Sequence, residues 1–178
     1  MKKILVVVDM QNDFIDGPLG NDECRAVVGN VVNVIESNQY DKVYVTYDTH
    51  MDNYLTTQEG INLPVKHCIK GTTGHQYNER VMNALTAKYE DNFEKIEKLT
   101  FGSDILGQNI KHYIKGDEAE IDFIGVCTGI CVISNVLVTK AFNPEARISV
   151  IENACACVTP ESHKTAIEAM KLCQVNIK

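Results

Sequence analysis

Residues 4–14 read ILVVVDMQNDF, and this stretch decides the fold. Its first five residues are all apolar and the run ends at Asp9. The apolar segment is short, and no small-residue cleavage site follows it, so it does not match a secretory signal. We therefore expect a first buried strand over residues 3–9 of a cytoplasmic protein.

Outward from this stretch, short β-branched runs alternate with longer segments of helical periodicity. The predicted strands cover residues 3–9, 42–48, 93–97, 120–126, 147–152 and 174–177. The predicted helices cover residues 24–36, part of 79–88, 104–113, 129–142 and 161–172. This alternation predicts an α/β fold, a doubly wound and mostly parallel six-stranded sheet with helices on both faces in a Rossmann-like, three-layer arrangement.

The length of 178 residues predicts one domain over residues 1–178. A net charge of -7 argues against nucleic acid or an anionic membrane surface as a partner, because both need a basic face. Seven irregularly spaced cysteines, an odd number, favour free thiols over a disulfide framework.

Polar side chains gather where the predicted strands end. Asp9 and Asp48 end the first two strands, Lys98 follows the third, and Cys127 and Cys131 follow the fourth. The carboxyl ends of parallel strands meet at one edge, where open α/β sheets bind ligands. We expect these titratable groups to face one crevice.

The two cysteines of GVCTGICVISN, residues 125–135, differ in position. If Thr128 caps the following helix, Cys131 lies in its first turn, where the helix dipole favours a thiolate. Cys127 then lies in the preceding turn. The alternative is that both are small buried apolar residues, as free cysteines commonly are.

A second group of residues could bind a metal. It combines Asp48 and His50 with Glu59 and His67, in and beside a long irregular stretch over residues 49–76. Carboxylates and imidazoles are good ligands for zinc, iron or manganese. A loop of this length in a compact domain is usually functional.

Five motifs together resemble the isochorismatase-like cysteine hydrolases, and among them the nicotinamidases most closely. In chain order they are ILVVVDMQNDF, YDTH, HCIKGTTG, EKLTFGS and GVCTGICV, spanning residues 4–132. The resemblance implies the doubly wound fold and a hydrolase that releases ammonia or an amine from a small amide. Nicotinamide is the leading substrate.

The resemblance also implies residue roles. Asp9 is the general acid and base, Lys98 its charge partner and Cys131 the nucleophile that forms an acyl-enzyme. The backbone N–H groups of Cys127 and Cys131 form the oxyanion hole, with a cis peptide bond between Val126 and Cys127. A divalent metal, zinc or else iron or manganese, is held by a set of four side chains: Asp48, His50, Glu59 and His67.

Further implications concern the substrate. Phe14 and Phe101 take positions that pack on the substrate ring in relatives. Gly129 stands where the family usually has Asp, and the chain has no Trp, so other small amides, ureido or carbamoyl compounds remain alternatives. True isochorismatases lack the nucleophile, so Cys131 favours C–N bond hydrolysis.

Two other hypotheses remain: a thiol or metal-binding module without turnover, and a family member that has lost activity and acts as a subunit. Competent residues at positions 9, 98 and 131 argue against the second of these. The family also implies a homo-oligomer.

Overall fold

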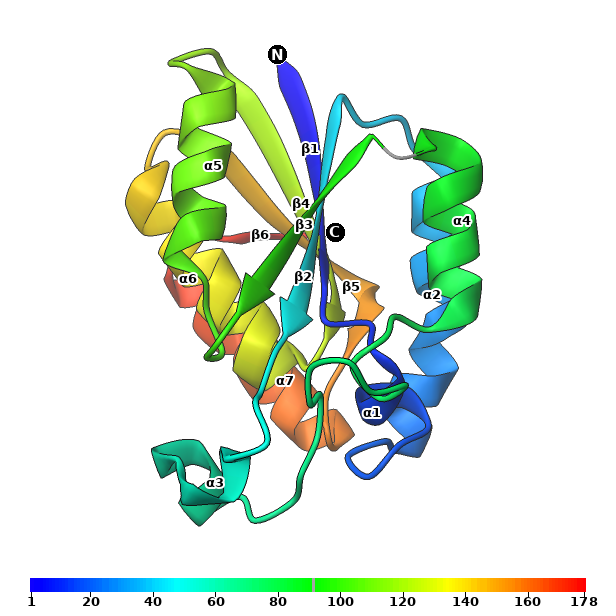
Figure 1. Cartoon of the computed structure of the whole chain (residues 1–178). Helices are drawn as coiled ribbons and strands as arrows, with labels where there is room; N and C mark the ends of the chain where they lie inside the picture. The colour runs from blue at the N-terminus through cyan, green and yellow to red at the C-terminus, as the bar shows by residue number, and fades with distance from the viewer. Residues whose placement is uncertain (91) are drawn as a thin grey trace.

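The computed structural model describes residues 1–90 and 92–178, and a six-stranded sheet forms its centre (Figure 1). The strands are β1 (Lys2–Val8), β2 (Lys42–Asp48), β3 (Phe93–Lys98), β4 (Ala119–Val126), β5 (Arg147–Ala156) and β6 (Asn176–Ile177). They lie in the order β3-β2-β1-β4-β5-β6, and each neighbouring pair is parallel. The predicted fold class is confirmed, with a sheet that is parallel throughout.

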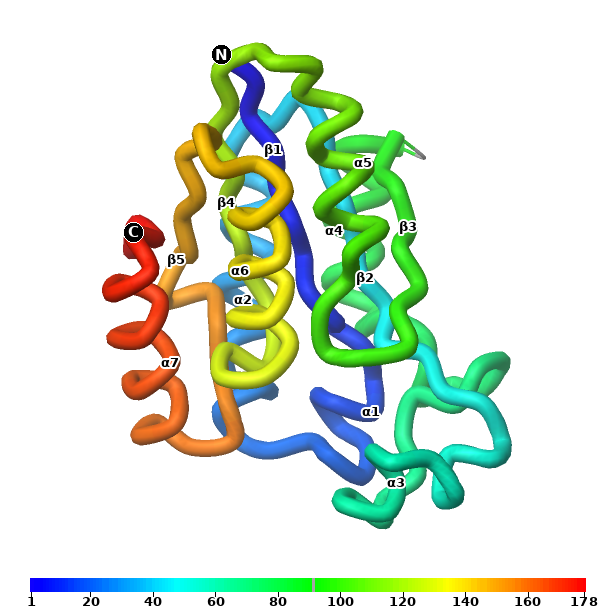
Figure 2. Tube along the Cα trace, turned by 90° about the vertical axis from the view of Figure 1, so that its left-hand side faces the viewer, coloured from blue at the N-terminus to red at the C-terminus, as the bar shows by residue number. Residues whose placement is uncertain are grey.

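Helices cover both faces of this sheet. On one face lie α2 (Asp22–Ser37) and α4 (Glu79–Tyr89); on the other lie α5 (Asp104–Ile114), α6 (Ile133–Phe142) and α7 (Pro160–Leu172). Figure 2 shows the second group in front of the strands. These helices confirm the predicted ones to within a few residues at each end.

The side chains of β1 alternate between two hydrophobic cores. Leu5 and Val7 pack with α2 and α4, whereas Ile4, Val6 and Val8 pack with α5, α6 and α7. A strand buried on both faces needs apolar side chains at every position. This is why the run is apolar from residue 4 to residue 8.

The structure differs from the predicted elements in four places. The stretch predicted as an irregular loop contains a 3-10 turn (Tyr54–Thr56) and α3 (Gln58–Asn62), and a short α1 (Asn12–Ile15) follows β1. The predicted helix over 129–142 begins as a π-helical turn, Thr128–Val132. β5 continues past the predicted end at residue 152, because its ladder with β4 resumes after an irregularity and pairs Val126 with Ala156.

The strand order places a ligand crevice. Chain connections leave β1 toward one face of the sheet and β4 toward the other, so the order reverses between these two neighbours. Ligands of doubly wound sheets bind beyond the carboxyl ends of the strands at such a point. Asp9 follows β1 there, and Cys127 follows β4. Among the described residues, no helix combines the length and apolar character needed to cross a membrane.

Candidate active site

Asp9 is the first residue after β1 and is completely buried. Its φ of 47° turns the chain sharply out of the strand. The carboxylate Oδ1 accepts a hydrogen bond from the Thr46 hydroxyl at 2.6 Å, and Oδ2 lies 2.7 Å from the Lys98 ammonium. Burial raises the pKa of Asp9 against the opposing effect of Lys98. The carboxylate is therefore a stronger base than an exposed aspartate.

Lys98 ends β3 and contacts three partners. Its Nζ lies 2.7 Å from Asp9 Oδ2, 3.3 Å from Asp48 Oδ1 and 3.6 Å from Cys131 Sγ. Burial disfavours the charged ammonium, but the nearby Asp9, Cys131 and Asp48 outweigh it and raise the pKa of Lys98. One buried cation thus joins the predicted catalytic residues to a predicted metal ligand.

Cys131 lies in the π-helical turn before α6, and its side chain is almost fully buried. The sulfur accepts a hydrogen bond from Lys98 Nζ at 3.6 Å, and the same ammonium contacts the Asp9 carboxylate. Burial raises the pKa of Cys131 well above its usual value, although Lys98 opposes the shift. The resting thiol is therefore protonated, and it needs a base to become a nucleophile.

The predicted capping role of Thr128 is wrong. The π-helical turn begins at Thr128 itself, and the residue in the N-cap position is Cys127, which makes no side-chain capping bond. The Thr128 hydroxyl instead pairs with Nδ1 of His163 on α7 at 2.8 Å. This contact fixes the turn against a neighbouring helix.

Cys127 has the backbone geometry that the family resemblance implies. The cis peptide bond between Val126 and Cys127 is confirmed. Contacts with the thiols of Cys157 and Cys24 raise the pKa of Cys127. In the described part of the chain, the Cys127 N–H donates to no protein acceptor, so it is free to bind a developing oxyanion.

The four predicted metal ligands meet at one point. One ligand atom from each of them lies within 4.8 Å of the others. Asp48 Oδ2 is 3.0 Å from His50 Nε2 and 3.4 Å from His67 Nε2. Glu59 Oε1 is 3.5 Å from His50 Nε2. β2 supplies Asp48, whereas Glu59 comes from α3, which hangs below the sheet in Figure 1.

The imidazoles fit a metal. The buried Nε2 of His50 lies 3.0 Å from Asp48 Oδ2, but it is not aligned for a hydrogen bond with any protein acceptor in the described part of the chain. A buried nitrogen without a well-aligned partner is costly unless something else binds it. His67 turns its Nδ1 to the Val65 carbonyl at 2.8 Å. This bond leaves Nε2 directed at the cluster, as in metal sites where a second contact orients the ring.

A cavity of about 300 Å³ connects the two groups of residues. Cys127 and Cys131 line it together with three of the predicted metal ligands, Asp48, Glu59 and His67. Its remaining lining is apolar: Phe14, Leu19, Leu63, Phe101, Ile130 and Val158. The predicted ring-packing residues, Phe14 and Phe101, are thus both pocket residues.

Sequence reasoning did not assign the four aliphatic residues of this lining. Val158 follows β5 at the same carboxyl edge, so a correct strand end would have indicated it. Ile130 lies between the two cysteines of one motif. Leu19 and Leu63 come from loops, and no local pattern marks them.

Gly129 faces away from the pocket, toward α7. A Cβ placed there would contact Cys157 Sγ at 3.4 Å and Ala166 Cβ at 3.6 Å. Gly129 is also absent from the cavity lining. The departure from the family pattern at Gly129 suggests an effect on substrate choice, but a side chain there would point toward α7 and not into the pocket.

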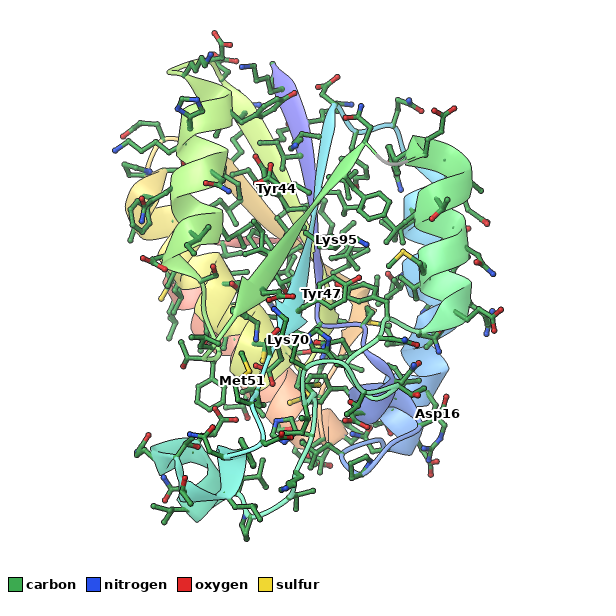
Figure 3. The ribbon with its side chains drawn as sticks, in the orientation of Figure 1. Asp16, Tyr44, Tyr47, Met51, Lys70 and Lys95 are labelled. Carbon is green, nitrogen blue, oxygen red and sulfur yellow. The ribbon has the colours of Figure 1, made fainter. Side chains whose placement is uncertain are left out.

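A larger, open hollow of about 750 Å³ borders Tyr47, His75 and Lys95. Tyr47 and Lys95 come from β2 and β3 and lie above the sheet edge that Met51 and Lys70 mark in Figure 3. None of the predicted catalytic or ligand residues lines this hollow. The smaller cavity is the candidate site because the reactive side chains meet there.

Comparisons with known proteins identify the family of the chain. The model of the isochorismatase domain matches residues 3–177. The chain is 30% identical over 174 residues to the uncharacterised isochorismatase family protein PncA of Bacillus subtilis, covering 94% of this chain and 93% of the relative.

Solved structures share the fold. The nicotinamidase PncA of B. subtilis superposes with a TM-score of 0.79 at 26% identity and 99% coverage of both chains. The pyrazinamidase of Pyrococcus horikoshii, solved in complex with zinc, gives 0.77 at 22% identity, with 100% and 99% coverage. The resemblance in the motifs is confirmed, and the chain belongs to the isochorismatase family, whose nicotinamidase members are hydrolases of amide C–N bonds.

Proposed function

We propose that this protein is a cysteine-dependent amidohydrolase that converts nicotinamide to nicotinate and ammonia through a Cys131 acyl-enzyme. Its family makes the chain a hydrolase acting on amide C–N bonds. The observation that carries the proposal is the contact of Lys98 with both the Cys131 sulfur and the Asp9 carboxylate, all three buried at the switch point of the sheet.

The proposed reaction has two halves. Asp9 takes the proton of Cys131, and the thiolate attacks the amide carbon to give a tetrahedral intermediate. Protonated Asp9 then gives its proton to the leaving nitrogen, ammonia departs, and a thioester remains. Asp9 next takes a proton from water, whose hydroxide attacks the thioester and releases the acid, and the proton returns to the Cys131 sulfur.

Lys98 and the turn supply the electrostatics of this proposal. Lys98 stays charged in all steps because its pKa is raised, so it balances Asp9 or the thiolate in turn. The oxyanion of each tetrahedral intermediate would accept hydrogen bonds from the N–H groups of Cys127 and Cys131. The unpaired N–H of Cys127 supports this role.

We further propose that a divalent metal, with zinc as the leading candidate, binds to Asp48, His50, Glu59 and His67. The convergence of four ligand atoms and the Nε2 of His50, which lacks a well-aligned partner, support this assignment. When bound, the ion would act as a Lewis acid that holds an electron-pair donor of the substrate. The positions of the four ligand residues and of Cys131 would set the distance between the substrate's donor atom and the nucleophilic sulfur.

The pocket lining favours a neutral substrate. Its described residues include two carboxylates but no Lys or Arg. In the proposed site the metal ion would be the cationic partner, and the carboxylates of Asp48 and Glu59 already balance its charge. A ureido or carbamoyl acid would therefore bury an additional, uncompensated carboxylate, which is costly. The aromatic walls of Phe14 and Phe101 suit a flat ring. We therefore favour a small uncharged aromatic amide.

The test is ammonia release by the wild type, Cys131→Ala and Cys127→Ala. We expect the wild type to hydrolyse nicotinamide well and N-carbamoylglycine, an anionic ureido acid, poorly. Cys131→Ala should lose at least about 10³-fold in kcat, because the nucleophile is gone. Cys127→Ala is the matched control and should keep most activity, since its contribution is through the backbone.

Equal activity of Cys131→Ala and the wild type would reject the nucleophile. Preference for the ureido acid would reject the substrate class while leaving the mechanism intact.

A further inference from the structure

Asn135 makes three hydrogen bonds beside the nucleophile. It lies on α6, one turn after Cys131, and is completely buried. Its amide nitrogen donates to the Cys131 carbonyl at 2.8 Å and to the Phe101 carbonyl at 3.1 Å, and its amide oxygen accepts from the Ser103 N–H at 3.0 Å. One side chain thus joins the nucleophile to the loop that follows β3.

This loop approaches α6 closely. A Cβ placed on Gly102 would lie 3.2 Å from the Ser134 carbonyl oxygen and 3.3 Å from the Ser134 Cβ. The glycine therefore lets the two backbones approach to the distance that the Asn135 bonds require. Phe101, between Lys98 and this point of contact, forms one wall of the pocket but is partly exposed itself. In the described part of the chain, no backbone–backbone hydrogen bond involves Phe101.

A second asparagine repeats the pattern away from the site. Asn143, at the end of α6, is also buried, and its amide nitrogen donates to the Thr139 carbonyl at 3.0 Å and to the Gly107 carbonyl of α5 at 3.2 Å. Both asparagines thus bond to the carbonyl four residues earlier and to a carbonyl of the segment packed against α6. Only Asn135 touches residues of the candidate site.

We propose that Asn135 is a positioning residue, which holds the Phe101 wall of the pocket in register with Cys131. The proposal rests on the proposed function in one respect, that substrate lies between these two residues. The shape of the pocket then depends on the hydrogen bonds that Asn135 makes to two elements. The bond to the Phe101 carbonyl holds the pocket wall and so affects substrate binding. The bond to the Cys131 carbonyl holds the turn that carries the sulfur.

The kinetic experiment separates the two halves. A threonine on a helix donates its hydroxyl to the carbonyl four residues earlier, so Asn135→Thr keeps the contact with Cys131 and loses the two contacts with the loop, to the Phe101 carbonyl and from the Ser103 N–H. We expect KM for nicotinamide to rise about fivefold or more with kcat nearly unchanged, because hydrogen bonds that hold the pocket wall are lost. Asn135→Ala loses all three contacts, so its kcat should fall as well.

Asn143→Thr and Asn143→Ala are the matched controls. They remove the corresponding carbonyl bonds at the residue that caps the C-terminal end of α6, so their melting temperatures should also fall, while KM and kcat stay at wild-type values. Asn135→Ser, which makes the same back-bond with a smaller side chain, serves as a second variant should the threonine not fold. If the Asn135 and Asn143 variants share the same kinetic constants, Asn135 is structural only and the proposal fails.

A second measurement is independent of turnover. The chain contains no Trp but seven Tyr, so Phe101→Trp introduces a single tryptophan in the pocket wall, which can be excited selectively at about 295 nm. In that background, acrylamide quenching should rise at least about twofold with Asn135→Thr and not with Asn143→Thr, because only the first frees the loop. Equal quenching would overturn the proposal. A wild type that hydrolyses no amide would reject the proposed function, and this comparison would still decide the role of Asn135.

Discussion

One lysine balances the buried charges at the residue scale. Lys98 pairs with Asp9 and lies near Asp48, and all three are almost completely buried. Lys98→Met would remove the cation and leave Asp9 without its partner. We expect a loss of about 3–5 kcal/mol in the free energy of unfolding, the range found when one partner of a buried pair is removed, together with loss of activity.

The loss should depend on pH. Lys98 lowers the pKa of Asp9, which burial raises, so Lys98→Met raises that pKa further above its unfolded value. The folded variant then binds a proton that the unfolded chain has lost, and its stability falls as pH rises through the folded pKa. Urea unfolding at pH 5 and pH 8 should show the larger deficit at pH 8. Asp9→Asn/Lys98→Met should recover part of it, and a deficit independent of pH would contradict the argument.

The position of a residue at the carboxyl end of a parallel strand explains which site residues could be predicted. Asp9, Asp48 and Lys98 each end or follow a strand of one parallel sheet, so their meeting follows from the alternation of strands and helices. Glu59 could not be placed in this way, because α3 lies in a stretch whose path no local pattern specifies. Its residue type made it a candidate ligand, and the resemblance to a known family gave it a place in the ligand set. Asn135 carried no signal, since a polar residue inside a helix is usually solvated.

At the scale of an element, Gly125 near the end of β4 and Gly129 in the turn that follows it differ in how much space a side chain would have. Gly125 has φ of +117°, and a Cβ there would lie 2.1 Å from the Val8 carbonyl oxygen of β1. Gly129 has ordinary contacts at 3.4 Å or more. We expect Gly125→Ala to cost more than about 2 kcal/mol, whereas Gly129→Ala should stabilise by about 0.5 kcal/mol through helix propensity.

Thermal unfolding of the two variants provides the measurement, and each is the control for the other. KM of Gly129→Ala should equal that of the wild type, since its Cβ would face α7 and not the pocket. A changed substrate preference in Gly129→Ala would return substrate choice to this position.

The turn after β4 shows which feature of the secondary structure could not be predicted from the sequence. Periodicity found each strand and each long helix because buried positions repeat with the period of the element. It placed the start of the helix after β4 at Gly129, but a π-helical turn from Thr128 precedes α6. That turn depends on tertiary contacts, among them the bond of Thr128 to His163, which residue spacing does not encode.

At the scale of the whole molecule, the metal group joins segments that are distant in sequence. β2 supplies Asp48, α3 supplies Glu59, and His67 returns from the loop beyond it. A bound ion would close this stretch onto the sheet and stabilise the folded chain by mass action. Removal of the metal should therefore change two properties together: the stability of the carboxyl end of the sheet and the shape of the pocket.

The last prediction follows from that coupling. Protein stripped with a chelator should melt at a lower temperature, and zinc at 100 times its Kd should restore about 2.7 kcal/mol. His50→Ala should abolish this gain, whereas His112→Ala, an exposed histidine on α5, should keep it. For the pH dependence of zinc binding, the state of His67 matters. Burial opposes protonation of His67, but the bonds of His67 to Asp48 and to the Val65 carbonyl outweigh burial and raise its pKa. Zinc must displace that proton, so the zinc affinity, measured by calorimetry, should fall as pH falls. An equal zinc-induced shift in His50→Ala, or none in the wild type, would contradict the assignment of these four ligands.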